Sequence, residues 1–305
     1  MIKKILALVL VVLVVAVCVA LVVVNSKFQV ITSSPDVSHK TLLKPETRIQ
    51  LVVNVPLLKG IIEQQFLKGT SVPPWVLPLA LPNEAAVLVD TDYVLGDMKL
   101  TLLINDKRLG PVILQKLNAL KLPAPVNAWF PNPMEARGRG KLVREGTTRL
   151  NPALMELIKQ YWPNAKVAEP LDVEGGHMIE AVFDNRDGGA LAIIGALVAS
   201  QGIDVVGQLK GNDRIEAIPQ QIKSVRIQAD VTPANALQVH FAVDCEKDMA
   251  PIILMGVQIG FPKLQEFARM AKIDVQGGAA LKGTVVEGNY TVPNFSGLLA
   301  MGGLK

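Results

Sequence analysis

Two aspartates, two positions apart, form a carboxylate pair whose spacing fits catalysis. Asp90 and Asp92 fall in a run with strand-like alternation, so both side chains point to the same side of the predicted strand. Such a pair can serve a hydrolase or transferase, or bind a divalent cation. A hard cation needs about six oxygen ligands or substrate phosphates, and no second acidic cluster or glycine-rich phosphate loop accompanies the pair. We therefore predict two solvated acids on a polar strand face.

The three histidines give no sign of a metal or nucleophile site. His39 falls in a polar linker, His177 follows Gly175 and Gly176 in a predicted turn, and His240 alternates onto the polar side of a strand. None has a second histidine or a glutamate at zinc-ligand spacing. No G-x-S-x-G or comparable nucleophile signature is present. The sequence predicts no catalytic residue, no metal site and no cofactor.

Tryptophans beside prolines are the first candidates for a docking surface. Aromatic residues form 5% of the chain, yet all three tryptophans lie next to proline-containing turns. Trp75 stands in the segment PPWVLP, Trp129 and Phe130 precede Pro131, and Trp162 precedes Pro163. Apolar loops with an aromatic side chain suit docking to a partner or to the membrane interface. A long loop pinned by its own side chains is the alternative.

A basic stretch is the second candidate. Arg137, Arg139 and Lys141 alternate through glycines, so in an extended chain they share one side. This geometry suits anionic lipid headgroups, wall polymers or an acidic partner, and a solvated basic hairpin explains it equally well. The whole chain carries a net charge of +4 and an isoelectric point of about 9.0. That charge is too weak to indicate nucleic-acid binding.

The N-terminus carries the clearest targeting signal. Residues 5–24 are uniformly apolar, without charge or proline, and a helix of this length matches a hydrocarbon core about 30 Å thick. Lys3 and Lys4 precede the run, so the positive-inside rule predicts a cytoplasmic segment at residues 1–4 and an extracytoplasmic location for the bulk of the chain. A cleavable signal peptide has a shorter apolar core of about 7–15 residues. We predict an uncleaved, single-pass signal-anchor helix.

Beyond the anchor, a polar stalk over 25–44 precedes segments with the alternation of half-buried strands. One polar and one apolar side is typical of antiparallel sheet. The apolar positions of these strands are Ile49, Leu51, Val53 and Val55; Met98, Leu100, Leu102 and Ile104; Val225, Ile227 and Val231; and Leu237, Val239, Phe241 and Val243. Once the anchor is set aside, Cys245 is the one cysteine left, so this part forms no intrachain disulfide.

Prolines mark the predicted helix starts, because a proline at the first helical position loses no intrahelical hydrogen bond. Such starts are Pro56, Pro111, Pro152 and Pro262, each followed by apolar residues at helical spacing. The fold class expected is α+β, with antiparallel sheet and helices packed on one face. A similar order of elements in 97–120 and 236–267 suggests two related halves, 45–165 and 166–305. A chance echo of any strand–helix fold is the alternative.

These features favour a membrane-anchored, extracytoplasmic binding or scaffold module of the cell envelope that catalyses nothing. Its partners would be the bilayer, through residues 5–24, and an envelope protein, polymer or lipid; no nucleic acid is expected. A lipid-binding or lipid-transfer domain tethered at the membrane is one alternative. An envelope hydrolase or transferase that uses Asp90 and Asp92 is the other.

Overall fold

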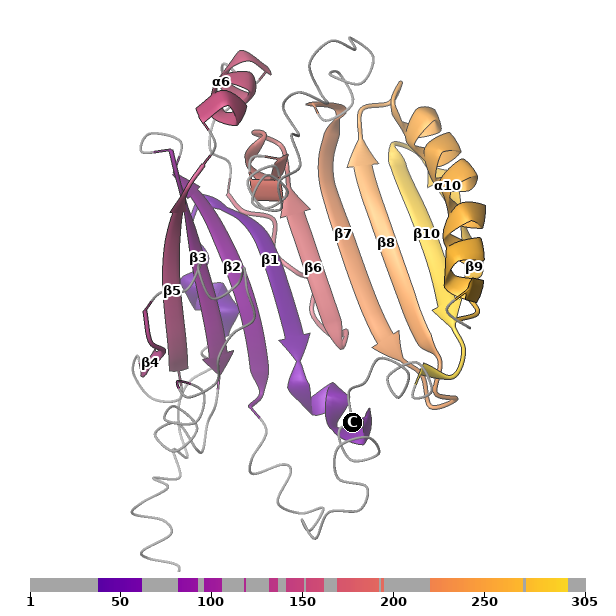
Figure 1. The fold of residues 1–305 in the computed structure, drawn as a ribbon, viewed down its shortest axis with the longest axis horizontal. Helices are drawn as coiled ribbons and strands as arrows, with labels where there is room; N and C mark the ends of the chain where they lie inside the picture. Colours follow the sequence, from indigo (N-terminus) through magenta and orange to yellow (C-terminus); the bar gives the residue numbers. More distant parts are fainter. Residues whose placement is uncertain are drawn as a thin grey trace, which may run out of the picture.

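The described part of this computed structural model comprises residues 38–61, 82–92, 96–105, 118, 132–136, 141–150, 152–161, 169–191, 193–194, 220–270 and 273–295. It contains one ten-stranded sheet in the order β4-β5-β3-β2-β1-β6-β7-β8-β10-β9, in which every neighbouring pair is antiparallel (Figure 1). The α+β class and the antiparallel sheet predicted from the sequence are confirmed.

Each predicted half contributes one side of this sheet. The first supplies β1 (Thr47–Asn54), β2 (Glu84–Asp92), β3 (Asp97–Asn105), β4 (Glu135–Ala136) and β5 (Lys141–Arg149). The second supplies β6 (Ile179–Asp184), β7 (Ile222–Val231), β8 (Leu237–Cys245), β9 (Gln276–Lys282) and β10 (Val285–Val292). The two sides join where β1 pairs with β6. The predicted boundary at 165/166 lies outside the described residues, and a kinship between the halves stays a prediction.

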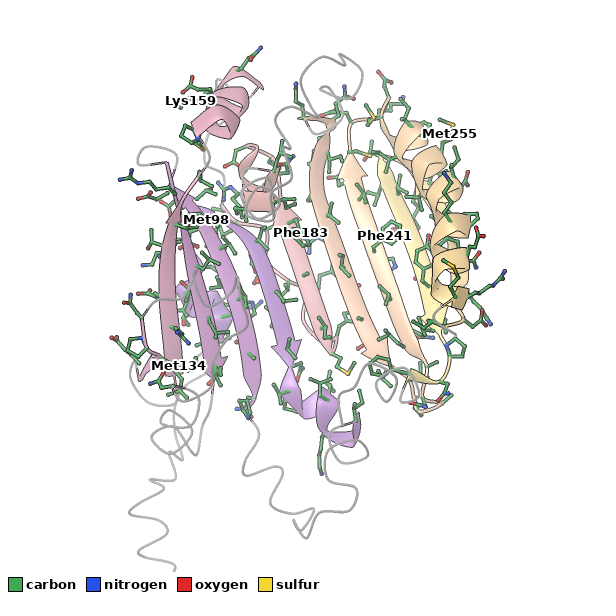
Figure 2. The ribbon with its side chains drawn as sticks, in the orientation of Figure 1. Met98, Met134, Lys159, Phe183, Phe241 and Met255 are labelled. Carbon is green, nitrogen blue, oxygen red and sulfur yellow. The ribbon has the colours of Figure 1, made fainter. Side chains whose placement is uncertain are left out.

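Strand register aligns the apolar positions of neighbouring strands into one continuous surface, here called the apolar face. Ile49 on β1 pairs with Val89 on one side and Phe183 on the other, and Val225 and Val243 continue the row across β7 and β8. Phe183 and Phe241 mark the face on β6 and β8 in Figure 2. The strand positions predicted from alternation therefore lie on the expected side, except Val55, which lies in a 3-10 helix after β1.

The other side of the sheet, here called the opposite face, differs between its halves. Over the first half it is a packed core: Val52, Ala86, Leu103 and Val143 form a buried cluster with Val173 and Val182 of the second half, and Leu42 and Leu171 pack against it. Residues 38–44 and 169–178 lie over this cluster, so part of the predicted stalk packs on the sheet. In the second half the same face carries polar side chains such as Arg226, Gln228 and His240. The predicted arrangement, with one polar and one apolar face, is therefore present only in the second half of the sheet.

Helix α10 (Ala250–Met270) packs on the apolar face at the β9–β10 edge (Figure 1). Met249, Ala250, Ile253 and Leu254 cluster with Phe241, Val243, Cys245, Ala279 and Val286. The predicted helix start at Pro262 is wrong, because the helix begins at Ala250 and Pro262 lies inside it. Phe261, one residue earlier, packs on Tyr290 with ring centroids 4.3 Å apart. The helix continues past Pro262 despite the lost hydrogen bond, with Phe261 packed before the proline and Ala268 buried after it.

The other predicted helices have mixed outcomes. Helix α6 (Pro152–Tyr161) begins at Pro152, as expected. At Pro56 the chain forms the 3-10 helix η2 (Val55–Leu58), and a further 3-10 helix, η1 (His39–Leu42), lies at the start of the described chain. The helix predicted after Pro111 and the anchor at 5–24 lie outside the described residues. Within the residues that the structure describes, no helix is both long and apolar enough to cross a membrane.

Candidate functional site

Most docking residues predicted from the sequence fall outside the described chain. These are Trp75, Trp129, Phe130, Arg137 and Arg139. Lys141 begins β5, where its backbone pairs with Asn105, but its side chain is not among those described. The docking role of all six residues stays a prediction.

Asp90 is not the solvated acid that the sequence predicted. It is 6% exposed. Its Oδ2 accepts a hydrogen bond from Nζ of Lys44 at 2.8 Å, and its Oδ1 accepts one from Oγ1 of Thr47 at 2.8 Å. The carboxylate therefore holds the chain entering β1 onto β2, which gives it a structural role. The side chain of Asp92 lies outside the described residues.

His39 is the centre of a buried charge cluster that the sequence did not reveal. It is 3% exposed. Its Nδ1 lies 3.0 Å from Oε2 of Glu84, and its Nε2 lies 3.1 Å from Oδ1 of Asp172, which Lys40 also contacts at 2.8 Å. Burial opposes the charge on the imidazole, but the two carboxylates outweigh it and raise the pKa of His39 above the usual 6.5. The partners are 45 and 133 residues away, so no local pattern announces them.

His177 is held at the end of a tight turn. Gly175 and Gly176 have φ of +86° and +97°, a left-handed backbone that glycine adopts without strain. Oε2 of Glu180 accepts the Gly175 N–H at 3.0 Å, and Oε1 accepts the His177 N–H at 3.3 Å. Nδ1 of His177 lies 2.5 Å from Oδ2 of Asp230 on β7. The turn thus closes over the opposite face where the two halves of the sheet meet.

Two pockets on the opposite face share His177 and are here together called the polar groove, after the polar side chains among their lining residues. The first has a volume of about 350 Å³ and the second about 240 Å³. The first is lined by Ser38, His39, Lys40, Val52, Asn54, Pro56, Asn83, Glu84, Asn105, Val173, Gly175, Gly176, His177 and Glu180. The second is lined by His177, Gln228, Asp230, Gln238, Val239, His240, Asn289, Tyr290 and Thr291.

Charged groups in the polar groove are already engaged with one another. Glu84 contacts His39, Glu180 accepts the turn N–H groups, and Asp230 accepts from His177 and from the backbone N–H of Met178. Among the described side chains, no three His, Cys, Asp or Glu residues are placed to hold a metal ion. The groove therefore presents side chains that can form hydrogen bonds with a polar ligand.

Cys245 has no features of a reactive thiol. It is fully buried under α10, with Sγ 3.2 Å from the carbonyl oxygen of Thr284. Burial, with the nearby charge of Asp244, raises the pKa of this thiol, which disfavours the nucleophilic thiolate. We assign Cys245 to the core beneath α10.

The apolar face is the second candidate surface. Leu51, in the middle of the sheet, is 38% exposed. Residues with the same orientation on β6, β7 and β8 are half-buried, except Ala181 and Cys245, which are buried. The half-buried residues are Ile179, Phe183, Val225, Ile227, Ala229, Val231, Leu237, Val239, Phe241 and Val243, of which the last two pack under α10. A contiguous apolar surface of this kind is rare on soluble monomers and is typical of sites for apolar ligands or partners.

No protein-family model matches this sequence, and no curated protein matches it. Among solved structures, the chain is similar to crystal form I of TP0453, with a TM-score of 0.33 and 9% identity over 88% of this chain and 98% of that one. Crystal form IV of TP0453 gives a TM-score of 0.36 and 8% identity over 87% of this chain and 99% of that one.

Proposed function

We propose that this protein is a non-catalytic lipid-binding module tethered to a membrane by residues 5–24, with its bulk outside the cytoplasm. The supporting observation is the partly exposed apolar face that runs over β1, β6, β7 and β8 without a charged side chain. This observation favours the lipid-binding alternative within the broader class of envelope binding modules that the sequence indicated.

An acyl chain is the ligand whose chemistry fits this face. Burial of each methylene contributes about 0.8 kcal/mol, so an acyl segment of about ten methylenes gains roughly 8 kcal/mol of gross stabilisation. The β-branched side chains of Val225, Ile227 and Val239 present methyl groups to such a chain. A bilayer next to the domain would supply the lipid at high local concentration.

The charged groups favour binding over catalysis. The hydrolase or transferase alternative requires Asp90, but this carboxylate already accepts hydrogen bonds from Lys44 and Thr47. His39 and His177 each contact a carboxylate, at 3.0 and 2.5 Å, on the side of the sheet away from the apolar face. An acyl chain on the apolar face would therefore meet no candidate acid, base or nucleophile among the side chains described on β1, β6, β7 and β8.

A photoactivatable phospholipid with a diazirine in its acyl tail tests this proposal. The full chain is incorporated in nanodiscs that contain the probe, irradiated and mapped by peptide mass spectrometry. We expect adducts on β1, β6, β7 and β8, and a several-fold loss of them in Leu51→Glu. Leu57→Glu is the matched control, because Leu57 is 50% exposed but lies in η2, outside these strands. Adducts absent from all four strands would refute lipid binding at this face.

The polar groove supports a second candidate, a module that binds a hydroxyl- and amide-rich envelope polymer. Neutral side chains such as Asn54, Gln238 and Thr291 line its two pockets. Co-sedimentation of the nanodisc-held chain with purified peptidoglycan tests it. Gln238→Ala should weaken binding several-fold, whereas Gln276→Ala, at the β9 edge and outside the groove lining, should not. Equal sedimentation of both variants would discard the groove as the site.

A further inference from the structure

Helix α10 has apolar side chains on two opposite sides. The inward side, with Ile253, Leu254 and Phe261, packs toward β8, β9 and β10. On the outward side, Ile252, Met255 and Ile259 are 47%, 55% and 58% exposed. These three residues are spaced by three and four positions, so they form one stripe along the helix. Figure 2 places Met255 on the outer side of α10.

The outward stripe contains more exposed apolar side chains than is usual on the side of a helix that contacts only water. Residues 250–262 carry no charged side chain, and the exposed Gln258 is the one polar side chain that borders the stripe over the first three turns. Lys263 stands one turn beyond Ile259 on the same side, followed by Glu266 and by Met270, which is 73% exposed. An exposed apolar stripe followed by a basic residue resembles the membrane-facing side of helices that lie in a membrane interface.

We propose that the outward stripe of α10, formed by Ile252, Met255 and Ile259, lies in the interfacial region of the bilayer that holds the chain. This inference rests on the tether in the proposed function, and it assigns a second membrane contact separate from the apolar face. Lys263 is then placed to meet an anionic lipid headgroup.

The tether makes the bilayer the occupant that the stripe meets first. Residues 25–37, between the predicted anchor and the described chain, span at most roughly 45 Å when extended. Ten strands at a spacing of about 4.8 Å extend over roughly 43 Å, so α10 at the far edge stays within reach of the membrane. A second copy of the chain would have to diffuse to the stripe, whereas the bilayer is always present.

Site-specific photocrosslinking in nanodiscs tests the contact on the full chain. Benzoylphenylalanine in place of Met255 should give at least fivefold more phospholipid adduct than the same group in place of Gln238, an exposed residue on the opposite face. The double variant Ile252→Gln, Ile259→Gln, at two exposed positions, should lower the Met255 adduct several-fold. Lys263→Gln should remove any preference for anionic over zwitterionic nanodiscs.

The outcomes separate this contact from lipid binding on the sheet. Lipid adducts from position 255 without diazirine adducts on β1, β6 and β7 would support the α10 contact and reject the proposed function. Diazirine adducts on the sheet with no lipid adduct at position 255 would support the proposed function and reject the α10 contact. Protein dimers crosslinked through position 255 would overturn the proposal in favour of a second copy. A chain that nanodiscs do not retain would overturn both.

Discussion

Both halves of the sheet are antiparallel, but they are packed differently. In the first half, both faces contain buried side chains: Leu100 is 3% exposed on the apolar face and Leu103 is 0% exposed on the opposite face. In the second half, β7 and β8 are half-buried along most of their length. The same antiparallel architecture therefore serves as a closed core on one side and as a presenting surface on the other.

Charged and polar side chains also differ between the two halves. Arg48, Asp187 and Asp90 are buried and paired in or beside the first half, where they fix the ends of β1 and β2. Polar side chains of the second half, such as Gln228 and His240, line the polar groove. Local stability should therefore be higher in the first half than in the second.

The largest expected effect concerns the buried pair of Arg48 and Asp187. Oδ2 of Asp187 lies 2.7 Å from Nε and 2.5 Å from Nη2 of Arg48, and the two side chains are 1% and 4% exposed. Asp187→Asn leaves the guanidinium charge buried without its counter-charge. We expect the free energy of unfolding to fall by about 3–5 kcal/mol in urea titrations.

Glu246→Gln is the control for that variant. Glu246 pairs with Lys223 at 3.1 Å, but both side chains are at least 40% exposed. Such a surface pair contributes about 0–1 kcal/mol. Similar losses in the two variants would mean that the first half is not the better-packed region.

A matched pair of leucine truncations tests the packing difference directly. Leu103→Ala removes a fully buried side chain from the first-half core and should cost about 2–5 kcal/mol. Leu237→Ala, on half-buried β8, should cost clearly less than half of that amount. Urea unfolding measures both. Equal costs would show that the second half is packed as tightly as the first.

The sequence predicted the sheet well because alternation is a local signal. Leu100 and Val239 belong to runs in which every second residue is apolar, and each lies on the predicted side of the sheet. The buried opposite face of the first half was missed, because Val52 and Leu103 face outward by pattern and become core only when residues 38–44 and 169–178 fold over them. When segments distant in the sequence cover a sheet face, the strand residues beneath them show no periodic pattern that would predict it.

The candidate sites were less predictable than the sheet. The sequence predicts a solvated Asp90 and places His39 in the polar stalk, but their partners lie far along the chain, and the strand order β2-β1-β6 brings them together. The outward stripe of α10 was missed for a different reason. The sequence predicts a helix start at Pro262, whereas the helix begins at Ala250, so the prediction places Ile252, Met255 and Ile259 outside a helix.

Titration of the His39 cluster gives the third prediction. Since the pKa of His39 is raised in the folded protein, its stabilising contribution is complete below the unfolded value of about 6.5 and is lost as the pH rises through the folded value. The free energy of unfolding should therefore decline above pH 6.5. His39→Gln should lower stability by roughly 1–3 kcal/mol at pH 6 and flatten this decline.

Asp172 sets the acid limit of the same cluster. Burial alone would raise the pKa of Asp172, but Lys40 and His39 lower it below 3.8, so its contribution holds above that value and is lost in acid. His240→Gln is the control, because the partner of His240 is the uncharged Asn289 at 2.9 Å. An unchanged slope in His39→Gln, or a flattened one in His240→Gln, would contradict the assignment.

The smallest effect is expected at the outer edge of the second half. Lys282 on β9 contacts Glu287 on β10 at 3.0 Å, but the lysine side chain is 77% exposed. Lys282→Gln should therefore change the free energy of unfolding by less than about 1 kcal/mol, and added salt should remove the difference. A charged residue on an edge strand also opposes pairing with another sheet edge. The variant should consequently self-associate more than the wild type in analytical ultracentrifugation, and a stability loss as large as that of Leu237→Ala would show that this edge is not the weakly held end of the sheet.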